Sequence, residues 1–152
     1  MADAQIQQLA ALQERLERVE DLLQIHQLFV DYGRHLDKRD FHAYAQLFSE
    51  DGELLLGPLA RARGRAEIET VMAKVLGDVP GANVHIISSP AVELDGDRAT
   101  AEVMWTVLNR STKGNPVLTM VGHHVDDLVR EDGCWRFARR SGFVDIPSPS
   151  AD

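Results

Sequence analysis

Cysteine is nearly absent from this sequence, because Cys134 is the only one among 152 residues. No internal disulfide can form, and we expect a reducing, cytoplasmic environment. Basic residues are also scarce, since 16 Lys and Arg stand against 24 Asp and Glu and give a formal net charge of −8. This excess of negative charge argues against nucleic acid or an anionic membrane as the main partner.

Long apolar runs and familiar cofactor motifs are missing as well. The N-terminal stretch MADAQIQQLAALQERLERVEDLL is interrupted by Glu and Arg, so it is expected to be neither a signal peptide nor a transmembrane span. There is no phosphate loop, dinucleotide fingerprint or G-x-S-x-G motif, and no His, Cys or carboxylate cluster has metal-ligand spacing. We therefore expect a protein that uses no cofactor and no metal.

The sequence does contain enough apolar residues to form the core of one domain. Hydrophobic residues make up 44% of the chain and charged residues 26%, as in ordinary globular proteins. A chain of this length can bury roughly 70% of its unfolded surface without a disulfide or metal. We predict a single domain over residues 1–146, with an N-terminal helical extension at 4–23 and a flexible tail at 147–152.

The extension carries apolar residues at alternating spacings of three and four, as in positions a and d of a coiled coil. They are Leu9, Leu12, Leu16, Val19 and Leu23. This seam covers only about two heptads, fewer than a coiled coil normally needs. We expect it to dock on the body of the domain or on a neighbouring subunit of a homo-oligomer, trimer or dimer.

The rest of the first half is also typical of helices. A second apolar stripe predicts that the first helix continues to about Asp37, and it consists of Ile25, Leu28, Phe29, Tyr32 and Leu36. Asp40 is placed to cap a second helix at 41–48, closed by the SEDG stretch. A short strand in the ELLLGP stretch at 53–58, stopped by Gly57 and Pro58, and a third helix at 64–77 follow.

After Gly81 the pattern becomes extended. Four strand regions at 83–94, 98–110, 117–130 and 134–146 are separated by turn residues, and the first is interrupted or bent at Pro90. Helices followed by hairpin-connected strands predict an α+β fold. We expect N-terminal helices packed on a strongly curved antiparallel or mixed sheet, forming a cone that encloses an apolar pocket.

Several runs resemble a known family when they are taken in order. They are IHQLFVDYGRHLDKRDFHAYAQLFSEDGEL, GRAEI, VHIISSPAVELDGDRATAEV and GHHVDDLVREDGCWRFARR. Their order and spacing resemble the SnoaL-like branch of the nuclear transport factor 2-like superfamily. That branch includes polyketide cyclases, scytalone dehydratase, hexachlorocyclohexane dehydrochlorinase and bile-acid 7α-dehydratase, as well as proteins with no demonstrated activity. The resemblance implies the cone fold, while the function depends on the site.

The resemblance also implies catalytic residues. In the dehydratase and dehydrochlorinase members an Asp after the first long helix orients a His on the first long strand, and Asp37 and His85 stand at the matching places. Tyr32 matches a Tyr five residues before that Asp in the bile-acid dehydratases. Arg140 matches an Arg that lines the dehydrochlorinase pocket, although strand alternation allows only one of Arg139 and Arg140 to face inward.

The chemistry of these side chains suits proton abstraction. A neutral imidazole accepts a proton near neutral pH, and a carboxylate on its other ring nitrogen fixes the tautomer and stabilises the imidazolium. His85 would then be the base and Asp37 its orienting partner. Tyr32 could donate a hydrogen bond to a leaving hydroxyl or an oxyanion, and Arg140 could hold an anionic or carbonyl group of the substrate.

A further set of residues on the predicted strands is expected to contact substrate within the cone. It comprises Trp105, Asn109, Met120, His124 and Phe143. His123 and His124 are adjacent in a strand, so they point to opposite faces and cannot jointly bind one metal. Family members often carry an aromatic residue in place of His124, in the pattern G-x-aromatic-x-D. The histidine could therefore be a substrate contact, a second polar catalytic group or a subunit-interface residue.

Each of these residues also has a structural interpretation. Asp37 could be a helix-end residue, His85 a hydrogen-bonded core histidine, and Tyr32 part of the apolar stripe. The leading hypothesis is a cofactor-independent lyase acting on a hydrophobic cyclic small molecule. Alternatives are an isomerase or polyketide cyclase, a non-catalytic binding or assembly module, and the small subunit of a ring-hydroxylating dioxygenase. A bonded Asp37–His85 pair beside an open pocket favours the enzyme.

Overall fold

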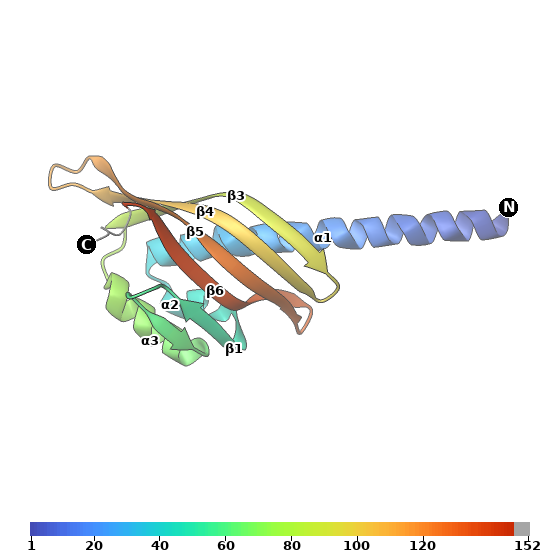
Figure 1. Cartoon of the computed structure of the whole chain (residues 1–152), viewed down its shortest axis with the longest axis horizontal. Helices are drawn as coiled ribbons and strands as arrows, with labels where there is room; N and C mark the ends of the chain where they lie inside the picture. Colours follow the sequence, from blue (N-terminus) through green and yellow to red (C-terminus); the bar gives the residue numbers. More distant parts are fainter. Residues whose placement is uncertain (148–152) are drawn as a thin grey trace.

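A computed structural model describes residues 1–147 of the chain, so the predicted tail at 147–152 lies outside the described residues except for Pro147. Three helices are present: α1 (Ala2–Lys38), α2 (Phe41–Gln46) and α3 (Arg65–Leu76). Six strands accompany them: β1 (Phe48–Leu55), β2 (Arg61–Arg63), β3 (Asn83–Asp95), β4 (Arg98–Arg110), β5 (Pro116–Glu131) and β6 (Cys134–Ile146). Figure 1 shows α1 lying along one side of the long strands, with α2 and α3 near β1.

The strands form one mixed sheet in the order β2-β1-β6-β5-β4-β3. Only β1 and β6 run parallel to each other, and every other neighbouring pair is antiparallel. The sheet is open, so the helices rather than further strands cover its inner face. The predicted α+β architecture, with N-terminal helices on a mixed sheet, is confirmed.

The inner face of the sheet is built by strand alternation. On β4 the buried residues are every second one: Ala99, Ala101, Val103, Trp105 and Val107. The stripe predicted on α1, from Ile25 to Leu36, is buried against this face and forms one core with it. The irregularity predicted at Pro90 is found as a shift of register between β3 and β4 from Ser88 to Ala91, within a strand that is not interrupted. The core therefore lies between the second half of α1 and the sheet.

The short elements between α1 and β3 differ from the prediction. Asp40 caps α2 as expected, and its side chain accepts a hydrogen bond of 3.0 Å from the backbone N–H of Ala43. However, α2 ends at Gln46, and β1 begins at Phe48 instead of at residue 53. The SEDG stretch lies inside the strand, because Phe48 pairs with Phe137 of β6. This long-range pairing overrides the local turn signal of the sequence. The three-residue edge strand β2 was not predicted at all.

The N-terminal half of α1 stands away from the domain (Figure 1). Its seam residues are all exposed, with fractions from 49% at Leu12 to 66% at Leu9. The expectation that the seam docks on the body of its own domain is therefore wrong. Over the described residues, no helix combines the length and apolar character that crossing a membrane requires.

Gly122 allows the middle of the sheet to pack around Trp105. A Cβ at this position would lie 2.0 Å from the carbonyl oxygen of Phe143 and 2.3 Å from Cζ2 of Trp105. We expect Gly122→Ala to lower the free energy of unfolding by about 1–3 kcal/mol or more, because backbone and indole must both move. Urea denaturation measures this change. Thr100→Ala, at an exposed position of β4, serves as the control, and equal stabilities of the two variants would contradict the packing described.

Candidate active site

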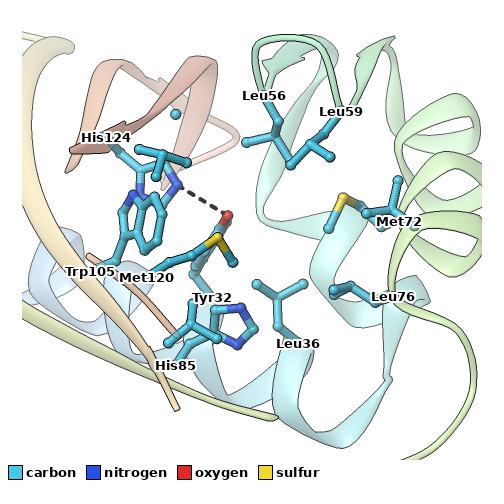
Figure 2. Close-up of a pocket in the computed structure, with 14 residues that line it drawn as sticks. Tyr32, Leu36, Leu56, Leu59, Met72, Leu76, His85, Trp105, Met120 and His124 are labelled. Atoms are coloured by element: carbon cyan, nitrogen blue, oxygen red, sulfur yellow. Dashed lines mark hydrogen bonds between the residues drawn. The ribbon is translucent and has the colours of Figure 1, made fainter. Parts of the chain in front are cut away.

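A cavity of about 120 Å³ opens between α1, α3 and the inner face of the sheet. Figure 2 shows Trp105, Met120 and His124 on one side of it and Met72 and Leu76 on the other. The lining is mostly apolar and consists of Tyr32, Leu36, Leu56, Leu59, Met72, Val75, Leu76, His85, Trp105, Val107, Met120, His124, Gly142 and Val144. Three groups in this lining carry polar side-chain atoms suited to proton transfer, namely Tyr32, His85 and His124.

Asp37 and His85 form a hydrogen-bonded pair at the junction of α1 and β3. The ring Nδ1 of His85 lies 2.8 Å from Oδ1 of Asp37. The backbone N–H of His85 also donates to the same carboxylate, at 3.0 Å to Oδ1 and 3.3 Å to Oδ2. Because an ionised carboxylate only accepts hydrogen bonds, Nδ1 carries the proton of the neutral ring. The other nitrogen, Nε2, is then the unprotonated one, and among residues 1–147 it has no hydrogen-bond partner.

Local sequence explains how the helix end reaches the strand. At Gly33 a Cβ would lie only 3.2 Å from Cγ1 of Ile87 and 3.5 Å from the carbonyl oxygen of His85. Glycine thus lets α1 pass close to β3. Arg39 ends the helix in a left-handed conformation, with φ of 62°. Its guanidinium donates to the carbonyl of Leu36 and to Oδ1 of Asn83, which ties the end of α1 to the start of β3.

Tyr32 and His124 form a second polar pair in the lining. The hydroxyl oxygen of Tyr32 lies 3.4 Å from Nε2 of His124, a long contact for a hydrogen bond (dashed in Figure 2). His124 is buried, and within the described chain its Nδ1 has no partner. Burial, aided by the positive charge of Arg140, lowers the pKa of His124 well below its usual value. The ring is therefore neutral at physiological pH.

Arg140 faces inward and Arg139 is exposed, which resolves the choice between them. Arg140 is fully buried and donates two parallel hydrogen bonds to Asp126, with Nε–Oδ1 and Nη2–Oδ2 distances of 2.8 and 2.9 Å. Its guanidinium lies 4.0 Å from the centre of the Tyr32 ring. It is absent from the cavity lining because the Tyr32 ring covers it. The expectation that Arg140 contacts substrate directly is thus corrected: it lies behind Tyr32.

Asp126 was missed by the sequence analysis, although the signal was present. It occupies the acidic position of the pattern G-x-aromatic-x-D, two residues after His124 and on the same inward face of β5. It pairs directly with Arg140 across β5 and β6. Burial raises the pKa of Asp126, and the neighbouring Arg140 opposes that shift. Burial also raises the pKa of the Tyr32 hydroxyl, again against the influence of Arg140.

The five residues expected to contact substrate are not all at the cavity. Trp105, Met120 and His124 line it, whereas Asn109 and Phe143 do not. Phe143 is 48% exposed on the outer face, because Gly142 on one side and Val144 on the other take the inward positions of β6. It stacks on His123, and the two ring centres are 5.0 Å apart.

Asn109 lies beyond a register shift after Val107, at the exposed end of β4. It borders a separate surface hollow near Gly81 and Pro116.

No group of three or more His, Cys, Asp or Glu side chains within the described part of the chain could hold a metal ion.

The depressed pKa of His124 makes stability depend on pH. An unfolded histidine binds a proton below about pH 6.5, whereas folded His124 resists doing so, and unfolding is therefore favoured as pH falls. We expect wild type to lose up to about 1.4 kcal/mol per pH unit below pH 6.5 from this residue alone. His124→Phe should lose correspondingly less between pH 7.5 and 5. Urea denaturation at both pH values tests this, and parallel losses in the two proteins would contradict a buried neutral imidazole.

Comparison with known proteins identifies the family of the chain. The model of the SnoaL-like domain matches residues 17–141. The uncharacterised protein Rv2910c of Mycobacterium tuberculosis H37Rv is 31% identical over 124 residues, which cover 80% of this chain and 84% of that protein.

Solved structures show the same fold. An NTF2-like protein with a cystatin-like fold from Novosphingobium aromaticivorans has a TM-score of 0.80 and 28% identity, with 92% of each chain covered. A protein from the same organism described as a candidate scytalone dehydratase has a TM-score of 0.74 and 25% identity, with 85% of this chain and 87% of that chain covered. A family match across most of the chain and a relative above 30% identity lead to one conclusion: the chain belongs to the SnoaL-like domain family, with the NTF2-like fold.

Proposed function

We propose that this protein is a cofactor-independent lyase of the dehydratase or dehydrochlorinase type, acting on a hydrophobic cyclic small molecule. The observation that carries the proposal is the 2.8 Å contact between Asp37 and His85, with His85 at the wall of an apolar cavity. A histidine bonded only to backbone, or a cavity filled by side chains, would have favoured a structural role instead.

The reaction would begin with Nε2 of His85 taking a proton from a substrate carbon. The electron pair of that C–H bond forms a double bond to the neighbouring carbon, and the bond from that carbon to a hydroxyl or chloride breaks. Asp37 stays ionised and stabilises the imidazolium through Nδ1–H. General-base assistance of this kind contributes about 10²–10⁴-fold to a rate.

The second polar pair supplies hydrogen bonds on another part of the cavity wall. The hydroxyl of Tyr32 and the neutral ring of His124 are suited to hydrogen-bond a departing hydroxyl or an oxygen that gains negative charge. The Arg140 guanidinium beneath the Tyr32 ring favours negative charge at that hydroxyl. Arg140 is therefore assigned a positioning and electrostatic role rather than a direct contact with substrate.

The size and polarity of the cavity support a ring-shaped apolar substrate. Its volume of about 120 Å³ is similar to that of an engineered apolar cavity, about 150 Å³, known to bind benzene. Few water molecules would remain beside a bound ring, and hydrogen bonds to developing charge are stronger in such a site. The relative described as a candidate scytalone dehydratase is consistent with this class of substrate and reaction. An isomerase or cyclase would begin with the same proton transfer.

Proton abstraction can be measured without knowing the leaving group. We would incubate the protein in D₂O with a panel of single-ring compounds that carry a hydroxyl or chloride next to an acidic C–H. Hydrogen–deuterium exchange and elimination would be followed by NMR and mass spectrometry. For any compound that reacts, we expect His85→Ala and Asp37→Asn to lower the rate by about 10²–10⁴-fold.

His26→Ala is the matched control, because His26 is an exposed histidine on α1 outside the cavity lining. Its rate should equal that of wild type. Reaction that persists at the wild-type rate in His85→Ala would exclude His85 as the base. Binding of ring compounds without any exchange or elimination would instead identify a non-catalytic binding module.

Tyr32→Phe separates the hydroxyl of this residue from its ring. The substitution keeps the packing of the ring against Arg140 and removes the contact with His124. We expect kcat to fall by about 10–10³-fold with little change in KM, because the hydrogen bond acts on charge that develops in the transition state. A rise in KM at unchanged kcat would show that the hydroxyl only binds the ground state.

We further propose that copies of the chain associate, and that the protein is cytoplasmic. Association is supported by exposed apolar side chains on the outer face of the sheet, among them Val84, Ile86, Val125, Phe143 and Ile146. The cytoplasmic location stays a prediction based on the single cysteine.

A further inference from the structure

The N-terminal half of α1 exposes a continuous row of apolar side chains. The exposed fractions of the seam residues are 66% at Leu9, 49% at Leu12, 58% at Leu16, 51% at Val19 and 63% at Leu23. Val30, 43% exposed, continues the same heptad spacing further along the helix. Together these six residues form an extended seam, which is longer than the two heptads seen in the first part of the helix.

The extended seam lies on the opposite side of α1 from the sheet. At about 100° per residue, its centre is roughly 160° around the helix from the buried stripe Ile25–Leu36. A second helix could approach the extended seam while each domain stays on the far side of its own helix. The same geometry prevents the extended seam from folding back onto its own sheet.

We propose that the extended seam binds the same surface of a second copy of this chain, forming a parallel two-stranded coiled coil over Leu9–Val30. Leu9, Leu16, Leu23 and Val30 take position a, and Leu12 and Val19 take position d. The paired region spans about three heptads and roughly 33 Å. This surface adds an interaction that the catalytic proposal neither needs nor implies.

Charge complementarity selects the parallel orientation. In this register Arg15 falls at position g and Glu20 at position e, so each Arg15 lies beside Glu20 of the other copy. The preceding pair, Gln8 at g and Gln13 at e, is uncharged. In an antiparallel pair position e faces e and g faces g, so Arg15 and Glu20 of the two copies would not meet.

His26 occupies the remaining d position along the extended seam and is exposed in the single chain. In the parallel pair it meets His26 of the second copy between the layers formed by Leu23 and Val30. A polar residue at one core position of a coiled coil fixes the register at some cost in stability. The proposal therefore predicts one register, with each residue beside its own counterpart.

The first experiment measures the mass of the full-length protein in solution by light scattering after size exclusion. The test variant is Leu12→Glu/Leu16→Glu, and the control is Ala10→Glu/Gln24→Glu, which adds the same charges at exposed positions off the extended seam. We expect the mass of the test variant to be half that of wild type, and the control to match wild type. Each chain contributes 16.9 kDa. Equal masses for wild type and the test variant would overturn the proposal.

The second experiment tests the orientation. Val19→Cys is made together with Cys134→Ser, so that the introduced thiol is the only one in the chain. In a parallel pair in register the two introduced thiols lie opposite each other and should form a disulfide-linked dimer under mild oxidation. Gln24→Cys in the same background is the control and should stay unlinked. Equal or no cross-linking at the two positions would rule out the parallel pairing.

Discussion

The carboxylate of Asp37 joins the first helix to the sheet, and both the fold and the candidate site depend on this junction. It accepts hydrogen bonds from the backbone N–H and the ring Nδ1–H of His85, so one side chain joins the end of α1 to the start of β3. An Asp near a helix C-terminus is opposed by the negative end of the helix dipole. The donors from His85 offset that cost, and Gly33 provides the close approach that makes them reachable. The contact that orients the proposed catalytic base therefore also contributes to packing.

A second polar arrangement supports another part of the cavity wall. The Arg140–Asp126 pair is fully buried, and such pairs contribute little net stability because both charges lose their hydration. Removing one partner, however, leaves an unpaired buried charge, so the two residues must be kept or lost together. The Arg140 guanidinium of this pair packs against the Tyr32 ring, and its positive charge helps to keep His124 neutral. We infer that its benefit lies in setting the electrostatics of the cavity rather than in stabilising the fold.

Periodicity explains which parts of the fold the sequence could predict. The stripe on α1 and the alternation on β4 depend only on local repeats, and both were found in the expected places. The start of β1 could not be predicted, since it is set by pairing with β6, which lies about ninety residues further along the chain. Strand β2 is only three residues long and is too short to show any repeat.

The candidate site also combines residues that the sequence could predict with residues whose positions depend on long-range pairing. Asp37, His85, Tyr32 and Arg140 were identified by resemblance to a family, whereas strand register decided which residues of the sheet face the cavity. Phe143 points outward because Gly142 and Val144 point inward, and a one-residue change of register would have reversed this. Asp126 was overlooked because it stands in a DD pair that looks exposed, although it holds the acidic position of the pattern G-x-aromatic-x-D. Only its partner across the sheet, Arg140, explains why it is inside.

The two halves of α1 connect the candidate site with the proposed association of copies. The C-terminal half is held by core packing and by Asp21, which accepts hydrogen bonds from Arg130 and Trp135. Burial alone would raise the pKa of Asp21, but these hydrogen bonds outweigh it and lower the pKa, so the carboxylate stays charged and the anchor persists. The residues before Asp21 have no comparable support within the described chain, and most of the stability of helices in proteins comes from tertiary packing of an apolar face. Pairing of two extended seams would stabilise this half while leaving Tyr32 and Asp37 where the sheet already holds them. The helix would thus separate the proposed association from the proposed chemistry, because its two apolar faces point in opposite directions.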